Sequence, residues 1–186
     1  MVHIWNYLTS IKMCSLRGGS GRIQAKFIAR ERLIITGSQH GEVRVFRYAK
    51  MVPMKATEII RFLAHSHHVR AIVVHPTESW ILTAGYDRTI KLWDWSKRWS
   101  GKQVFTGKHN LIFPILPILL LCESDLLGHT GNVMALALHP TDPLIFASAA
   151  ADDMIRVWRI GEVDSLYTLR GHQDVVGLWK CDGSGL

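Results

Sequence analysis

The chain has 186 residues, 48% of them hydrophobic and 20% charged, which is ordinary for one globular domain or part of one. Its 22 Lys and Arg residues against 15 Asp and Glu residues give a net charge of +7, which favours acidic partners such as carboxylates, anionic lipid head groups or nucleic acid. The basic residues are scattered, without a run of five or more, so a nucleic-acid-binding tail and a nucleic-acid partner are not expected.

The first residues of the chain and its cysteines predict the cellular compartment of the protein. Residues 1–5 lack a basic region followed by an apolar one, so no secretory signal is expected. Cys14, Cys122 and Cys181 are odd in number and have no CxxC spacing, which argues against a disulfide framework or a zinc site. A cytoplasmic protein with reduced thiols and no metal fits these features.

Three segments, 33–46, 81–93 and 146–158, share one pattern: a short apolar run, a polar tight turn, and an alternating run that ends in a large aromatic residue. Alternation of apolar and polar residues with period two is typical of β-strands. The pattern predicts strands at 33–38, 43–48, 69–75, 80–84, 90–95, 133–138, 144–149 and 154–159.

Equivalent positions in these segments keep a constant spacing, 47 residues from the first to the second and 65 from the second to the third. The spacing holds at a hydroxyl position, a turn position and an aromatic position. The residues are Thr36, Thr83 and Ser148; His40, Asp87 and Asp152; and Phe46, Trp93 and Trp158. An offset shared by so many positions indicates an internal repeat.

The repeat resembles the WD40 family, with Ala64-His65, Gly128-His129 and Gly171-His172 at repeat starts and Trp93-Asp94 at a repeat end. The resemblance implies four-stranded blades, each with a buried hydrogen-bonded tetrad of His, Ser or Thr, Asp and Trp. The full tetrads would be His65, Thr83, Asp87 and Trp93, and His129, Ser148, Asp152 and Trp158. At residues 22–48, His40 and Phe46 stand at the Asp and Trp positions, so that network should be missing or altered.

The expected fold is therefore all-β, an open arc of about three to four four-stranded blades of a WD40 β-propeller. Blades or parts of blades would occupy residues 1–21, 22–63, 64–107, 128–170 and 171–186. Because propellers close with about four to eight blades, this chain is not expected to close alone.

Residues 108–128 form an insertion, and without them the spacing from Trp93 to Trp158 falls from 65 to 44 residues, a normal repeat. The insertion holds an apolar run at 111–121 that has two prolines and is too short to span a bilayer. It is either a loop that binds a membrane or partner, or the read-through of a retained intron, whose pyrimidine-rich codons would encode Leu, Ile, Phe and Pro. The second interpretation is favoured, because an exposed apolar loop is costly in a soluble protein.

Longer stretches, such as 25–30, 64–77 and 93–105, are similar to the coatomer beta-prime family of vesicle-coat subunits, and less so to the sister alpha family. This resemblance implies a non-catalytic propeller of the COPI coat, peripheral on Golgi membranes and vesicles. It would bind the C-terminal dilysine tails of membrane cargo in Golgi-to-ER retrograde transport, with other coatomer subunits, the alpha subunit included, as partners.

Arg70 matches a basic position that holds the cargo's terminal carboxylate in that family, a task for which a guanidinium is well shaped. Ile23 stands where the preceding blade of the family has another Arg. Arg22 is adjacent, but alternation along a strand predicts that its side chain points to the other face.

Other interpretations are weaker. The histidines at 65–68 lack a matching Cys or His cluster for a metal, and the turn aspartates Asp87 and Asp152 have no nucleophile or base beside them for catalysis. Glycines at 18–21 lack the Lys-Ser/Thr of a phosphate loop and indicate a turn. No enzyme activity and no cofactor are expected. A generic WD40 scaffold, such as a ubiquitin-ligase adaptor or a chromatin reader, remains the alternative function.

Overall fold

The fold was analysed in a computed structural model, which describes residues 1–49, 54–105 and 128–174. These residues form a two-stranded sheet and three four-stranded sheets, all antiparallel, with one turn of 3-10 helix between the first two strands of the second sheet. Their bounds are β1 (Val2–Asn6), β2 (Ile11–Leu16), β3 (Gln24–Ile28), η1 (Ala29–Glu31), β4 (Leu33–Gly37), β5 (Glu42–Ala49), β6 (Lys55–Leu63), β7 (Val69–Val74), β8 (Trp80–Gly85), β9 (Ile90–Asp94), β10 (Ser100–Phe105), β11 (Val133–Leu138), β12 (Ile145–Ala150), β13 (Ile155–Arg159) and β14 (Ser165–Leu169).

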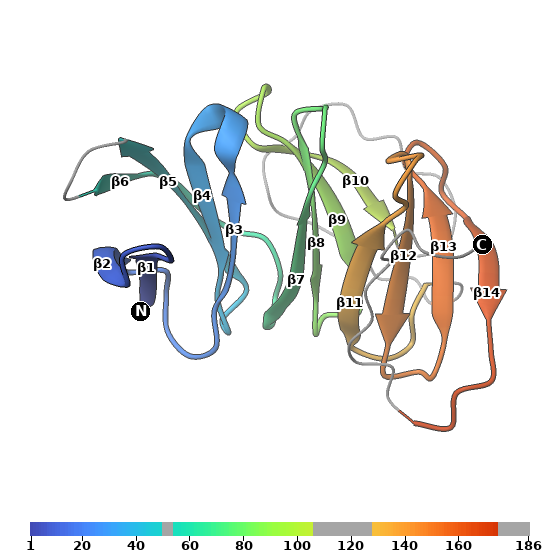
Figure 1. The fold of residues 1–186 in the computed structure, drawn as a ribbon. Coiled ribbons are helices and arrows are strands. Elements are labelled where there is room, and N and C mark those ends of the chain that lie inside the picture. Colours follow the sequence, from blue (N-terminus) through green and yellow to red (C-terminus); the bar gives the residue numbers. More distant parts are fainter. Residues whose placement is uncertain (50–53, 106–127, 175–186) are drawn as a thin grey trace.

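Each four-stranded sheet is a meander of consecutive strands, β3–β6, β7–β10 and β11–β14. The sheets follow one another in chain order from β1–β2 to β14, and the first and last lie at opposite ends of the arrangement (Figure 1). The expected all-β open arc of WD40-type blades is confirmed. All eight predicted strands are confirmed as well, with each end within one residue of its predicted place.

Apolar side chains fill the layers between neighbouring sheets. One layer joins β3–β6 to β7–β10 and contains Ile35, Val45 and Ile72, each no more than 2% exposed. A second joins β7–β10 to β11–β14 around Phe105 and Trp158. Burial of one such aliphatic side chain contributes roughly 1.5–3 kcal/mol, so these layers are the main reason that the sheets stay stacked.

The tight turns after β4, β8 and β12 share one backbone conformation. Gly41, Arg88 and Asp153 occupy equivalent positions and have φ angles of 79°, 65° and 60°. At Gly41 a Cβ atom would lie 1.8 Å from the carbonyl oxygen of His65, so glycine is required there. This turn holds the start of β5 next to the segment that follows β6, since the carbonyl of Gly41 accepts hydrogen bonds from the backbone N–H groups of Ala64 and His65.

Polar links join neighbouring sheets at the opposite end from these turns. The Arg30 guanidinium donates to the carbonyl oxygens of Pro76 and Glu78 and lies 4.9 Å from the centre of a Trp95 ring. Gln103 donates to the carbonyl of Glu162 at 2.6 Å, and its own amide oxygen accepts from a backbone N–H in the next sheet. The sheets are therefore connected by specific hydrogen bonds as well as by apolar packing.

The expected insertion at 108–128 lies outside the described residues except for Gly128, as do Cys122, Cys181 and most of the expected last blade at 171–186.

Candidate functional site

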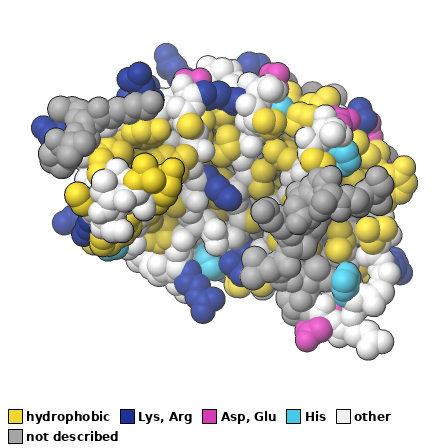
Figure 2. Space-filling view, viewed as in Figure 1, with side chains coloured by type: hydrophobic (Ala, Val, Ile, Leu, Met, Phe, Trp, Pro, Cys, Tyr) yellow, Lys and Arg dark blue, Asp and Glu magenta, His cyan; other side chains and the backbone are white. Residues whose placement is uncertain are grey.

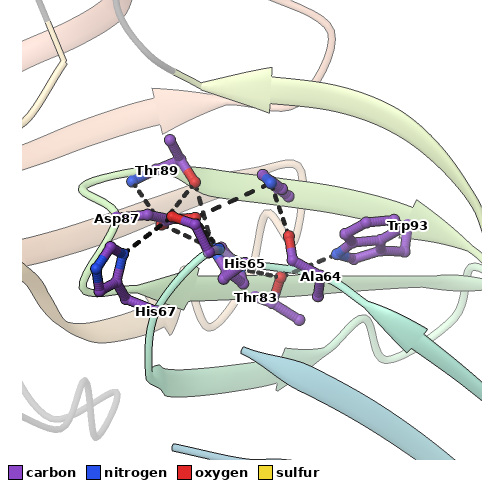
Figure 3. A network of polar contacts seen from close by, with 9 residues as sticks. Ala64, His65, His67, Thr83, Asp87, Thr89 and Trp93 are labelled. Atoms are coloured by element: carbon purple, nitrogen blue, oxygen red, sulfur yellow. Dashed lines mark hydrogen bonds and ion pairs between the residues drawn. The ribbon is translucent and has the colours of Figure 1, made fainter. Parts of the chain in front are cut away.

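A buried polar network crosses the β7–β10 sheet. The imidazole of His65 lies between two partners, with Nδ1 2.8 Å from Asp87 Oδ1 and Nε2 2.7 Å from Thr83 Oγ1. The indole N–H of Trp93 donates to the same Thr83 hydroxyl at 2.9 Å. Figure 3 shows these side chains converging from the loop before β7, from β8, from the turn after β8 and from β9. The structure thus brings all four residues of the predicted tetrad together.

The Asp87 carboxylate also fixes the backbone around it. Its oxygens accept hydrogen bonds from the backbone N–H groups of Ser66 and Thr89 and from the Thr89 hydroxyl. Burial alone would raise the pKa of Asp87, but the hydrogen bond and charge interaction with His65, with help from Thr89 and Lys91, lower it to about 2. The carboxylate is therefore ionised at neutral pH and ties the turn after β8 to the start of β7.

The β11–β14 sheet repeats this arrangement. His129 Nδ1 lies 3.0 Å from Asp152, its Nε2 lies 2.6 Å from Ser148 Oγ, and Trp158 Nε1 donates to that hydroxyl at 2.8 Å. Asp152 also accepts from the backbone N–H of Thr130. Burial would raise the pKa of Asp152, but its interactions with His129 outweigh burial and lower it. Both tetrads are satisfied internally, which assigns them to the framework and leaves them without a free group for chemistry.

The β3–β6 sheet lacks such a tetrad. Gly18 stands at the histidine position, and its carbonyl accepts a hydrogen bond of 3.3 Å from the Thr36 hydroxyl. The imidazole of His40 is exposed, at the position of the missing aspartate. A carboxylate is supplied two residues later instead, by Glu42, which forms an ion pair of 2.7 Å with Arg44.

A basic residue that was not predicted from the sequence recurs in the third strand of each four-stranded sheet. Arg44, Lys91 and Arg156 follow the same offsets of 47 and 65 residues, and this was the signal that could have revealed them. Lys91 donates to the carbonyl of Ala64 at 2.7 Å and lies 4.0 Å from Asp87. These cations stand next to the tetrad carboxylates or, in the first four-stranded sheet, next to the substitute Glu42.

The edge where the inner strands begin carries a group of basic side chains. Figure 2 shows histidine and basic side chains next to each other at this edge, at the bottom of the view. Arg70, the second residue of β7, is half-buried, and His68 just before the strand is 8% exposed. Burial lowers the pKa of His68, and the charges of Arg70 and Arg22 lower it further.

The start of β3 bears on the expected direction of the Arg22 side chain. β3 begins at Gln24, so Arg22 lies in a bend before the strand, where the alternation of strand faces does not apply. The charges of Arg70 and Arg22 both lower the pKa of His68, whereas Ile23 carries no charge. The direction of the Arg22 side chain stays a prediction.

A cavity of about 560 Å³ opens next to this group, beside the altered tetrad of the first four-stranded sheet. Its lining includes Arg17, Ser20, Ser38, His40 and Arg44. The lining combines charged or polar residues with apolar side chains at Met1 and Leu63.

Within residues 1–49, 54–105 and 128–174, no three His, Cys, Asp or Glu side chains come together as a metal site. Of the histidines at 65–68, His65 belongs to the tetrad, His67 is exposed and His68 is buried. The same residues include no helix long and apolar enough to cross a membrane. Gly18, Gly19 and Gly21 lie in the connection between β2 and β3.

Comparison with known proteins agrees with this architecture. The family model of the WD domain, G-beta repeat, matches residues 57–94 and 121–159. The coatomer subunit beta' proteins of Rattus norvegicus and Homo sapiens are each 36% identical to this chain over 81 residues, which is 44% of the chain and 7% of the relative. Coatomer subunit beta'-2 of Arabidopsis thaliana is 33% identical over 81 residues, again 44% of this chain and 6% of the relative.

The chain thus spans a small part of the length of these relatives, and the similarity concerns its repeats. Each matched segment contains three strands of a sheet that holds a complete tetrad, β7–β9 or β11–β13. It ends directly after the tetrad Trp, at Asp94 or Arg159. The β3–β6 sheet, whose tetrad is altered, lies largely outside the matched segments. Two segments of the chain are therefore similar to the WD domain, G-beta repeat, and the chain resembles coatomer subunit beta' over less than half of its length.

Proposed function

We propose that this chain is a non-catalytic, peptide-binding propeller of a vesicle coat of the COPI type, which recognises the dilysine C-terminal tails of membrane cargo in Golgi-to-ER retrograde transport. The similarity to coatomer subunit beta' supports a coat subunit as the class of protein. The chain would then act in the cytoplasm, peripheral on Golgi membranes and vesicles, together with other coatomer subunits such as the alpha subunit.

The single observation that carries the proposal is the placement of Arg70. Its guanidinium is half-buried at the edge where β7 begins, and no carboxylate among the described residues forms an ion pair with it. A guanidinium without a carboxylate partner suits the terminal carboxylate of a peptide, to which it can donate two parallel hydrogen bonds. The lysines of the tail require an acidic partner, for which other coat subunits or further residues are candidates.

A double-mutant cycle tests this contact. Isothermal titration would compare the wild-type chain and Arg70→Ala, each with a Lys-Lys-x-x peptide that ends in a free carboxylate or in an amide. Because a hydrogen bond to a charged group contributes about 1.5–3 kcal/mol, each single change should weaken binding roughly tenfold to a hundredfold. The two changes together should be less than additive, since they remove one shared contact.

Full additivity would show that Arg70 and the carboxylate do not meet. Absence of any binding by the wild-type chain would favour the alternative of a general WD40 scaffold. A preference for the dilysine peptide over a peptide with Ala in place of both lysines separates the coat function from that scaffold function.

A further inference from the structure

The two ends of the arc of sheets show the two halves of one kind of interface. Inside the protein, each sheet turns an aliphatic face to the sheet that follows it, and the following sheet turns back a large aromatic residue from its third strand. A large apolar residue from the outermost strand of the preceding sheet packs with this aromatic residue. The pairs are Leu16 with Phe46, Phe62 with Trp93, and Phe105 with Trp158, and the ring centres of the last two pairs are 4.7 and 5.8 Å apart.

The β11–β14 sheet has the same aliphatic face, but among the described residues no sheet follows to cover it. Val157 stands 65 residues after Leu92, which is 0% exposed against the next sheet, whereas Val157 is partly exposed. The pairing of β13 with β14 places Tyr167 beside Val157 and Leu169 beside Ile155 on this face. Tyr167 is 66% exposed and Leu169 54%. Contiguous exposed apolar side chains of this kind mark a contact surface.

The large side chains of this face lie on the two outer strands, β13 and β14. In the rows of Ile155 and Val157 the two inner strands carry only alanine, namely Ala135, Ala137, Ala147 and Ala149. Arg159, at the end of β13, adds no unpaired charge, because it pairs with Asp142 of its own sheet at 3.5 Å. A partner sheet of two strands would therefore cover the part of this face that is both large and apolar.

The β1–β2 sheet has two strands, and its outer face carries the aromatic half of the interface. Val2 and Ile4 pack toward the β3–β6 sheet, whereas their neighbour Trp5 is 58% exposed. Trp5 stands 41 residues before Phe46, the same distance that separates Ile4 from Val45. Trp5 is therefore equivalent to the tryptophans that pack between the later sheets, although no sheet precedes it in the part of the chain that the structure describes.

We propose that two copies of this chain associate head to tail, with Leu169 of each copy packed against Trp5 of the other. Leu169 stands at the position of Phe105, since each pairs with the first residue of the third strand of its sheet. The described strands make three and a half four-stranded sheets, so two copies would make about seven, within the four to eight with which propellers close. Head-to-tail contacts form a closed ring when the rotation between copies allows it. This association does not depend on the ligand of the proposed function.

Sedimentation velocity of the full chain tests the association. The unmutated chain should form a species with twice the mass of one chain, whose share rises with concentration between about 1 μM and 1 mM. Leu169→Asp and Trp5→Lys should each weaken this dimer at least about thirtyfold, as expected for a central residue of an interface. Val104→Asp, at an exposed valine of β10 that lies at neither end of the arc, is the matched control and should leave the dimer unchanged.

A mixture of the two variants determines the direction of the contact. A dimer of one Leu169→Asp chain and one Trp5→Lys chain contains one unmutated contact and one contact in which an acidic and a basic side chain meet. Mixing should therefore recover dimers that neither variant forms alone. A dimer that persists in Trp5→Lys would mean that two aliphatic faces pair with each other, which overturns the head-to-tail contact.

Both substituted side chains are largely exposed in the single chain, so the variants should keep the circular dichroism spectrum and thermal midpoint of the monomer. If a variant does not fold, the unmutated chain still decides the question. The mass of one chain at every concentration overturns the association, and masses that grow beyond two copies overturn the closed ring.

Discussion

The hydroxyl of Thr36 donates to the carbonyl oxygen of Gly18 over 3.3 Å, where the other two four-stranded sheets place a histidine ring against a hydroxyl. A Cβ atom on Gly18 would lie 3.2 Å from Thr36, so even a small side chain at this position would crowd the hydroxyl. The β3–β6 sheet therefore keeps its buried threonine satisfied through the backbone alone.

Loss of a tetrad carboxylate should destabilise the protein. Asp87→Ala and Asp152→Ala each leave a buried imidazole and a backbone N–H without their acceptor, which should lower the free energy of unfolding by roughly 1–3 kcal/mol. His40→Ala, at the equivalent exposed position, should cost much less. Urea unfolding of the three variants measures the difference, and equal midpoints would contradict the assignment of the tetrads to the framework.

The free energy of unfolding should also depend on pH, through the ionisation of Asp87. Its pKa is about 2 in the folded protein against an ordinary value of 3.8, so the unfolded chain takes up this proton more readily. The stabilisation is fully present above about pH 4 and is lost as the pH falls through about 2, with a total on the order of 2 kcal/mol. Urea midpoints between pH 2 and pH 6 should fall with acid in wild type, and less steeply in Asp87→Asn.

Gly41→Ala should be strongly destabilising. A left-handed backbone costs a non-glycine residue roughly 1–2 kcal/mol, and the new Cβ would also overlap the carbonyl oxygen of His65. Arg88→Gly, at the equivalent turn position with a φ angle of 65°, is the control and should be neutral or slightly stabilising. Thermal unfolding compares the two; an unchanged midpoint for Gly41→Ala would mean that this turn can rearrange.

Deletion of residues 108–128 is expected to improve solubility and thermal stability. The deletion joins Gly107 to His129 and restores a 44-residue spacing between Trp93 and Trp158. The apolar run at 111–121 is the part expected to promote aggregation. Light scattering and thermal unfolding check this, and increased aggregation after the deletion would argue that the segment packs as part of the fold.

Periodicity located the strands well where both faces of a sheet are covered. β4, β8 and β12 appear in the sequence as short apolar runs, because almost all of their residues are buried, and the period-two pattern is strong in β5, β9 and β13, where buried and partly exposed residues alternate. The outer strands β6, β10 and β14 were not among the predicted ranges, since they carry polar and exposed residues such as Glu58, Lys102 and Thr168. The constant offsets predicted the tetrad residues directly, because each of these residues lies a fixed number of residues from a tight turn.

Side-chain direction near the ends of strands could not be predicted in the same way. The expected direction of Arg22 assumed that this residue lies in a strand, whereas β3 begins at Gln24, so alternation does not apply to Arg22. The replacement of a turn aspartate by Glu42 could not be predicted from the sequence either, because the carboxylate lies at a different position of the repeat. Alternation fixes which face a residue takes only inside a paired strand.

The guanidinium of Arg30, which donates to the carbonyl oxygens of Pro76 and Glu78 and covers Trp95, has a consequence for how the protein opens. In arrays of stacked units, cooperativity arises from the contacts between nearest neighbours. This contact makes the opening of β3–β6 costly unless β7–β10 opens as well. Amide protons of β4 and β8 should therefore exchange with deuterium at similar rates, and Arg30→Ala should let β4 exchange first.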